Sequence, residues 1–179
     1  PILNSGFTAS DTSGCSNFSV QFTDKSYNPS NIDPIVSWNW DFGDGSSFNG
    51  QNPPVHNYGI GKYTVSLTIL TQQGSSKFTS ITNYIKVGKI TSINYDISPN
   101  TIPITCAKRN YSFTDLSVLE GTHDSTEVHY IWNFGDGDTS SKQNPIYNFA
   151  SDTGFMNIQL LVNYRGCKDS IIKNNLLYV

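Results

Sequence analysis

The chain has 179 residues, of which 36% are hydrophobic and 14% are charged, and its 11 basic and 14 acidic side chains leave a formal net charge of −3. This composition is too polar for a membrane protein and too apolar for a disordered chain, so we expect it to fold. The charges form no long run of one sign, which argues against a surface for nucleic acid or anionic membranes. No stretch predicts a membrane span and the first residues lack a signal-peptide pattern, so we expect a fragment of a longer protein.

Short segments with alternating apolar and polar residues follow one another along the first half of the chain. Residues 38–42 place three aromatic side chains on one face of a strand. Residues 43–45, Gly-Asp-Gly, come directly after this strand and predict a hairpin turn, because glycine reaches positive φ at little cost. A second turn signal, Gln-Asn-Pro at 51–53, precedes another alternating strand over 63–69.

The same elements recur in the same order in the second half of the chain. Residues 130–137 repeat the aromatic strand and its turn, 143–145 repeat Gln-Asn-Pro, and 156–162 repeat the later alternating strand. The motif residues shared by the two copies are Trp40, Phe42, Gly43, Asp44 and Gly45 in the first and Trp132, Phe134, Gly135, Asp136 and Gly137 in the second. The repeat predicts two domains, residues 1–88 and residues 89–179.

Each copy is expected to be an immunoglobulin-like β-sandwich. The alternation has a period of two in several runs, and no segment shows the spacing of an amphipathic helix, so the fold class is all-β. Regularly spaced short strands with glycine and proline turns are typical of two packed sheets. The material between the copies is only about Gly88 and Lys89, which is too short for a flexible tether. We therefore expect the two units to lie end to end.

The motif residues resemble a known family. The string from Trp40 to Gly45, followed by His56-Asn57-Tyr58 and then by residues 61–65, is similar to the polycystic kidney disease (PKD) domain. The second copy departs from the pattern, with Asn133 in place of an aspartate and Tyr147-Asn148-Phe149 in place of His-x-Tyr. The resemblance covers both copies and implies tandem immunoglobulin-like units of the kind found in extracellular parts of adhesins and secreted enzymes. The ending around residues 166–170 is similar to PKD repeats of large bacterial surface proteins linked to adhesion and gliding.

What the resemblance implies is a secreted or cell-surface protein, and a non-catalytic spacer or adhesion module within it. Its expected partners are neighbouring domains of the same polypeptide and a glycan or a surface protein, with no nucleic acid and no insertion into a membrane. The alternative is a carbohydrate-binding or calcium-binding accessory module of a secreted hydrolase. Most aromatic residues occupy alternating strand positions, but Tyr27, Phe48 and Tyr164 fall near turns where contact with a sugar is plausible.

The acidic residues near the motif have two interpretations. Asp24, Asp41 and Asp44 are oxygen donors that would suit calcium, the one cofactor that the family resemblance suggests. We favour structural roles, in which Asp44 stabilises its own turn and Asp24 bonds to the backbone of its loop, as Asp115 does in the second copy. No zinc-ligand spacing or nucleophile elbow is present, so no enzyme activity is predicted. His56 is expected to pack beside a neighbouring aromatic ring.

The three cysteines are unevenly shared between the copies. Cys15 and Cys106 occupy the same position of the repeat, whereas the position of Cys167 is Ser75 in the first copy. One hypothesis is a disulfide between Cys106 and Cys167 within the second copy, with Cys15 as half of the same bridge in the first. The alternative is three buried thiols. A disulfide would persist only in an oxidising compartment, in agreement with an extracellular location.

Overall fold

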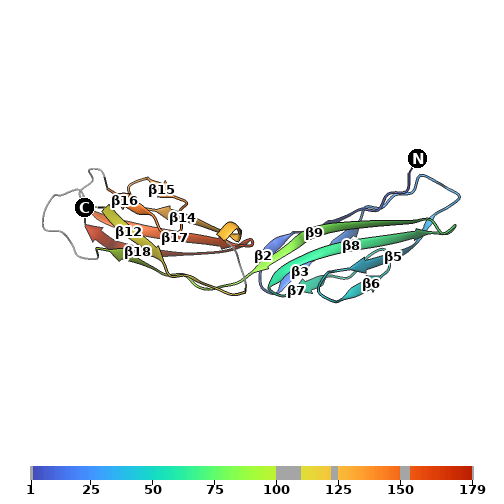
Figure 1. Ribbon diagram of the computed structural model, residues 1–179, viewed down its shortest axis with the longest axis horizontal. Helices are drawn as coiled ribbons and strands as arrows, with labels where there is room; N and C mark the ends of the chain where they lie inside the picture. The colour runs from blue at the N-terminus through green and yellow to red at the C-terminus, as the bar shows by residue number, and fades with distance from the viewer. Residues whose placement is uncertain (1, 100–109, 122–124, 150–153, 179) are drawn as a thin grey trace. The chain divides into compact units, whose positions relative to one another are not determined.

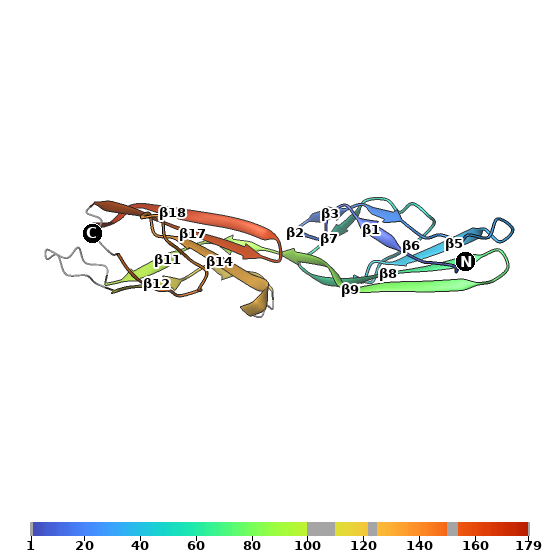
Figure 2. The same cartoon turned by 90° about the horizontal axis from the view of Figure 1, so that it is seen from above.

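The structure is a computed structural model that describes residues 2–99, 110–121, 125–149 and 154–178. Within these ranges the chain consists almost wholly of strands and the connections between them, apart from the short 3-10 helix η1 (Ser125–Glu127). The chain divides into two compact units, Pro1–Gly88 and Lys89–Val179. Figures 1 and 2 show the strands of each unit. No helix in the described ranges is long and apolar enough to cross a membrane. The prediction of an all-β, immunoglobulin-like fold is confirmed.

The first unit is built on a five-stranded sheet. The order of strands in this sheet is β2-β9-β8-β5-β6, in which β2 pairs with β9 in parallel and the other pairs are antiparallel. Two short antiparallel pairs, β1-β4 and β3-β7, supply the rest of the sandwich. The strands of this unit are β1 (Phe7–Ala9), β2 (Ser13–Cys15), β3 (Phe18–Val20), β4 (Phe22–Asp24), β5 (Ile35–Asp41), β6 (Ser47–Asn49), β7 (His56–Tyr58), β8 (Gly61–Thr71) and β9 (Ser76–Gly88).

The core of the first unit forms where the aromatic face of β5 meets the short strand pairs. Trp40 is fully buried, and its ring lies 5.5 Å from the ring of Phe7 and 5.9 Å from that of Phe22. Asn39 and Asp41, on the other face of β5, are exposed. Alternation in β8 buries Val65, Leu67 and Ile69 in the same core. The pattern of β5 therefore separates core from solvent as the alternation predicts.

The second unit also has two packed sheets, but with different numbers of strands. A four-stranded sheet of order β15-β14-β17-β18 packs against a three-stranded sheet of order β11-β12-β16, and β10 pairs with β13. The strands of this unit are β10 (Ile90–Ser92), β11 (Tyr95–Ser98), β12 (Asn110–Asp115), β13 (Val118–Leu119), β14 (Val128–Asn133), β15 (Thr139–Ser140), β16 (Ile146–Asn148), β17 (Phe155–Tyr164) and β18 (Cys167–Tyr178).

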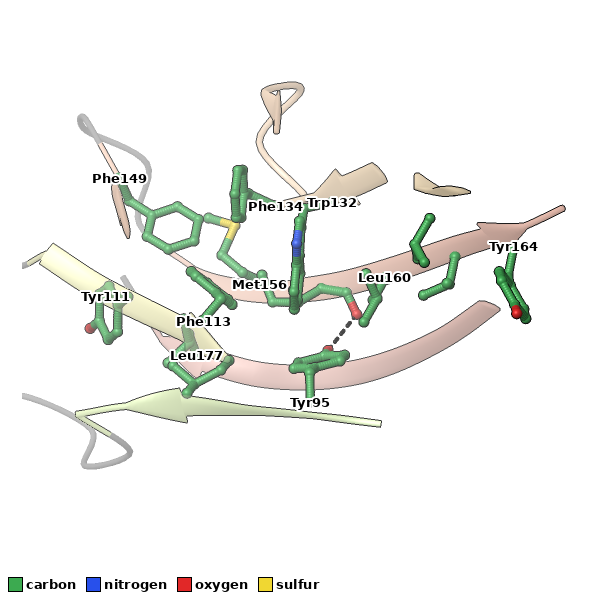
Figure 3. Packing of buried hydrophobic residues seen from close by; sticks show 14 residues of the cluster. Tyr95, Tyr111, Phe113, Trp132, Phe134, Phe149, Met156, Leu160, Tyr164 and Leu177 are labelled. Atoms are coloured by element: carbon green, nitrogen blue, oxygen red, sulfur yellow. Dashed lines mark hydrogen bonds between the residues drawn. The ribbon is translucent and has the colours of Figure 1, made fainter. Parts of the chain in front are cut away.

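The two units share the register of their central strands. Trp40 of β5 lies opposite Leu67 of β8, and Trp132 of β14 lies opposite Leu160 of β17. Figure 3 shows Trp132 among the aromatic and aliphatic side chains of the second core, where the Tyr95 hydroxyl donates a hydrogen bond to a β17 carbonyl at 2.7 Å. A tryptophan opposite a leucine therefore marks the same strand register in both units.

Candidate functional site

The Gly-Asp-Gly turn of the first unit joins β5 to β6. The Phe42 amide donates to the Ser46 carbonyl at 3.2 Å and closes the turn. Two carboxylates bond to the turn's own backbone: Asp41 accepts from the Gly43 amide at 2.8 Å, and Asp44 accepts from the Ser46 amide at 3.0 Å. Asp44 also accepts a hydrogen bond from the Ser46 hydroxyl. The turn therefore satisfies its backbone donors with the acidic side chains of the motif.

The two glycines of this turn differ in their surroundings. Gly43 has φ of 80°, and a Cβ added there would lie 2.3 Å from the carbonyl oxygen of Thr64 in β8. Gly45 has φ of 90°, but a Cβ added there would meet open space. In the second unit a Cβ on Gly135 would lie 2.8 Å from the Asn157 carbonyl oxygen, while the position of Gly137 is open. The first glycine of each motif is thus required by both conformation and close packing.

His56 of β7 covers this turn. Its ring stacks on Phe42, with the centroids 4.2 Å apart and the planes at 15°. Its Nε2 lies 2.7 Å from Asp44 Oδ2, and the two side chains are 19% and 22% exposed. Burial alone raises the pKa of Asp44, but hydrogen bonds from Ser46 and His56 outweigh this and hold the pKa below its ordinary value of 3.8. His56 thus packs beside an aromatic ring, as expected, and also ties β7 to the turn.

The combination of serine, histidine and aspartate is not arranged as a catalytic triad. A triad needs serine and aspartate on opposite nitrogens of the histidine ring. Here Asp44 and the Ser46 hydroxyl both approach the same atom, Nε2 of His56, at 2.7 and 3.4 Å. Ser46 also donates its proton directly to Asp44. This geometry stabilises a turn but cannot relay a proton from serine through the ring.

Tyr147 of β16 takes the place of His56 in the second unit. Its ring stacks on Phe134 at 3.9 Å with the planes at 6°. Its hydroxyl donates to Asp136 at 2.7 Å and to Asp138 at 2.8 Å. Burial and these two bonds raise the pKa of Tyr147. Sequence reasoning noted the His-to-Tyr difference but missed this role, although the repeat had aligned the two positions.

A second acidic residue of each unit links three segments. Asp24 accepts hydrogen bonds from the Ser26 amide at 2.8 Å, from Trp38 Nε1 at 2.8 Å and from Gln51 Nε2 at 3.1 Å. The carboxylate therefore ties the loop after β4 to strand β5 and to the loop after β6. The bond to the loop backbone is the one that the sequence predicts.

Asp115 makes the same kind of link in the second unit. It accepts from the Ser117 amide at 2.9 Å and from Gln143 Nε2 at 3.2 Å. Tyr130 replaces the tryptophan, and burial together with the charge and hydrogen bond of Asp115 raises the pKa of Tyr130 to about 12. Both units therefore keep the connection while changing one of its partners.

Residues 1–87 match the family model described as the PKD domain. The PKD1 domain of the Vibrio cholerae metalloprotease PrtV is 26% identical over 47% of this chain and 96% of its own length, with a TM-score of 0.39. The fibronectin(III)-like modules of Clostridium thermocellum CbhA are 12% identical, cover 97% of this chain, match over 94% of their own length and have a TM-score of 0.50. Murine CEACAM1b is 10% identical, and the match covers 96% of this chain and 98% of the CEACAM1b chain, with a TM-score of 0.57. The last two share the fold with this chain.

The turn of the first unit does not gather the acidic residues into one cluster. Asp24, Asp41 and Asp44 each bond to a different set of protein groups. In the part of the chain that the structure describes, no group of three or more histidine, cysteine, aspartate or glutamate side chains is placed to hold a metal ion. Calcium binding at these three residues remains a prediction.

The three aromatic residues proposed for sugar contact lie in different environments. Tyr27 is 63% exposed, as expected. Phe48 of β6 is partly buried against the core of the first unit. For Tyr164 the expectation of exposure is wrong, because its side chain is fully buried and the Arg165 guanidinium lies 4.9 Å from its ring centroid. Arg165 is held in turn by an ion pair with Glu127 at 2.7 Å. These three residues therefore do not form one aromatic platform.

The structure describes two of the three cysteines. Cys15 and Cys167 are both disulfide-bonded. The predicted bond between Cys106 and Cys167 does not account for the disulfide at Cys15, and Cys106 itself lies outside the described residues. Cys15 ends β2 opposite Gly88 in the parallel β2-β9 ladder.

Proposed function

We propose that the chain is a non-catalytic extracellular module of a larger surface or secreted protein, in which two PKD-type units in tandem act as a spacer or adhesion element. The observation that carries the proposal is the replacement of His56 by Tyr147. Both residues stack on the motif phenylalanine and bond the motif aspartate, yet their acid-base chemistry differs. A site selected for proton transfer would not tolerate this change, whereas a clamp on a hairpin turn requires only shape and a hydrogen bond.

The second unit supports a tandem of PKD-type units although the family model matches only residues 1–87. Trp132 has the same strand partner as Trp40, and its Nε1 donates to the Lys142 carbonyl at 2.9 Å, as that of Trp40 does to the Gly50 carbonyl at 3.0 Å. The glycine at the start of the turn faces a backbone carbonyl in both units. These shared constraints are the ones that define the turn of the motif.

The extracellular location is supported by two observations. PKD domains occur in extracellular proteins, and the disulfide bonding of Cys15 and Cys167 fits an oxidising compartment. Within this setting, the finer form of the proposal is adhesion to a glycan or a surface protein, such as a bacterial protein involved in attachment or gliding. The neighbouring domains of the same polypeptide are the other expected partners.

Surface display tests the spacer role directly. The chain is inserted between a cell-wall anchor and a reporter domain, and binding of a bulky ligand to the reporter is measured. We expect greater ligand binding than for a reporter fused directly to the anchor. The matched control carries Gly43→Ala and Gly135→Ala, which should disrupt both turns and lower the gain. Equal ligand binding with and without the intact insert would contradict the spacer role.

A glycan array separates the spacer from the carbohydrate-binding alternative. The spacer role predicts no retained glycan. A retained glycan whose binding is lost in Tyr27→Ala, but kept in the control Phe78→Ala, would favour the accessory module instead, because Tyr27 and Phe78 are exposed to a similar extent, 63% and 60%.

A further inference from the structure

The outer face of the five-stranded sheet in the first unit carries mainly uncharged polar side chains. Three rows of cross-strand neighbours run over β6, β5, β8 and β9, which lie side by side in Figure 1. The rows are Ser47, Asp41, Ser66 and Ser80, then Asn49, Asn39, Thr68 and Phe78, and then Ser37, Leu70 and Ser76. These side chains point away from the core, because the residues that alternate with them, such as Trp40 and Leu67, are buried.

The middle row combines one aromatic ring with three polar side chains. Phe78 of β9 is 60% exposed and lies opposite Thr68 of β8, which lies opposite Asn39 of β5. Asn39 Nδ2 donates a hydrogen bond to Asn49 Oδ1 in β6 at 2.6 Å. Beyond this bond, Asn39 Oδ1, Asn49 Nδ2 and the Thr68 hydroxyl have no hydrogen-bond partner among the residues that the structure describes. Adjacent strands are about 4.8 Å apart, so this row, called the Phe78 row below, spans about 14 Å.

The fold does not require an aromatic residue at position 78. Because the two units share the register of their central strands, the same row in the second unit consists of Ile131, Leu161 and Ser170. Ser170 is therefore the counterpart of Phe78. A single exposed apolar side chain is common on protein surfaces. An exposed ring beside amide and hydroxyl groups that have no partner is instead the combination of apolar and polar contacts that ligand sites use.

We propose that the Phe78 row binds a neutral glycan. The face of an aromatic ring packs against the apolar C–H surface of a sugar ring. Amide and hydroxyl groups supply both donors and acceptors, as the hydroxyl groups of a sugar require. A chain of sugars that crosses the strands would meet Phe78, Thr68 and Asn39 in succession. This inference rests on the adhesion form of the proposed function, in which the partner is a glycan.

The composition of the face separates a neutral glycan from other ligands. Asp41 is the one charged residue in the three rows, all of which lie in described residues, and its carboxylate accepts a hydrogen bond from the Gly43 amide. Nucleic acids and other polyanions require cationic partners, which these rows do not supply. Protein interfaces are depleted in serine, whereas serine is the commonest residue of the three rows.

A pull-down with polysaccharides tests the proposal on the full chain. The neutral probes are cellulose, chitin, laminarin and mannan, and heparin and polygalacturonate are the anionic comparisons. We expect retention on a neutral probe, and Phe78→Ala should weaken it at least about tenfold. Phe78→Trp, which keeps an aromatic face, should preserve retention. Asn39→Ala should weaken it about fivefold, as the loss of one hydrogen bond does. Retention on none of the neutral probes would overturn the proposal.

Tyr27→Ala is the matched control. Tyr27 is exposed to a similar extent, 63%, but lies outside the three rows, so its removal should leave retention unchanged. Thermal unfolding checks that each variant keeps its fold. Retention that survives Phe78→Ala, or that occurs only on the anionic probes, would overturn the proposal. Sedimentation velocity covers the remaining occupant: a dimer that Phe78→Ala dissociates would assign the face to a second copy of the chain and would also overturn it.

The outcome is separable from that of the proposed function. A chain that retains no neutral glycan would overturn the assignment of the Phe78 row and leave the gain in the reporter display unchanged. Equal reporter binding with and without the insert would contradict the spacer role and leave retention that depends on Phe78 unchanged.

Discussion

The two glycines of the first motif turn allow conformation and packing to be separated at the level of single residues. Gly45→Ala should cost about 1 to 2 kcal/mol, because an L-residue at positive φ is strained but the space is open. Gly43→Ala should cost about 3 kcal/mol or more, because its Cβ would also overlap the Thr64 carbonyl oxygen. Urea unfolding of the two variants measures the difference. Equal losses of unfolding free energy in the two variants would show that β8 moves away from residue 43 without an energetic cost.

The lowered pKa of Asp44 makes part of the turn's stability dependent on pH. A carboxyl whose folded pKa lies below its unfolded pKa stabilises the fold above the unfolded pKa, and this contribution is lost as the pH falls through the folded pKa. We therefore expect the stability difference between the unaltered chain and Asp44→Asn to shrink as the pH falls from about 5 to about 2. Chemical denaturation at several pH values measures it. A difference that grows on acidification would contradict the assigned direction.

At the level of residues, the sequence predicted which positions matter better than it predicted their contacts. The alternation in 38–42 and the glycines of the turn correctly indicated a buried aromatic face and a hairpin. The bond between His56 and Asp44 joins residues that are 12 positions apart and depends on how β7 lies over the turn. The alternating run over 156–162 predicts a strand that ends before Tyr164, and hence a turn there. Strand β17 instead continues to Tyr164, which lies two residues after Val162 and therefore on the same buried face.

At the level of elements, β7 and β16 play the same part in their units, because each provides a ring that packs over the hairpin turn. His56→Tyr should keep the stability of the first unit within about 1 kcal/mol, because Tyr147 shows that a tyrosine can stack and bond in this position. His56→Phe keeps the stacked ring but removes the hydrogen bond to a charged acceptor, and should cost about 1.5 to 3 kcal/mol. Thermal unfolding of the two variants compares them.

One result for His56→Tyr and His56→Phe would contradict this prediction. If His56→Tyr is as destabilising as His56→Phe, the hydroxyl does not reach Asp44, and the similarity of the two units does not extend to this bond. Ser46 in the first unit corresponds to Asp138 in the second, so the tyrosine would there have one acidic partner instead of two.

The strand pairing could be predicted in part. The repeat aligned β5 with β14 and β8 with β17, and these strands pair in the same register in both units. The parallel pair β2-β9 could not be predicted, because Ser13–Cys15 is three residues long and carries no alternating pattern. This short pair places Cys15 opposite Gly88.

For the whole molecule, the repeat and the packing of the chain both divide it between Gly88 and Lys89. Each unit has its own buried cluster, centred on Trp40 in the first and on Trp132 in the second.

Separate cores predict separate unfolding of the two units. In calorimetry with reductant, Gly43→Ala should lower one melting transition by more than about 10 °C, since 1 kcal/mol shifts a domain of this size by about 4 to 8 °C. Gly135→Ala should lower the other transition, because its Cβ would lie 2.8 Å from the Asn157 carbonyl oxygen in β17. Gly137→Ala, in open space, is the control and should lower the same transition as Gly135→Ala by a smaller amount. A single transition that both Gly43→Ala and Gly135→Ala lower together would mean that the two units unfold as one cooperative body.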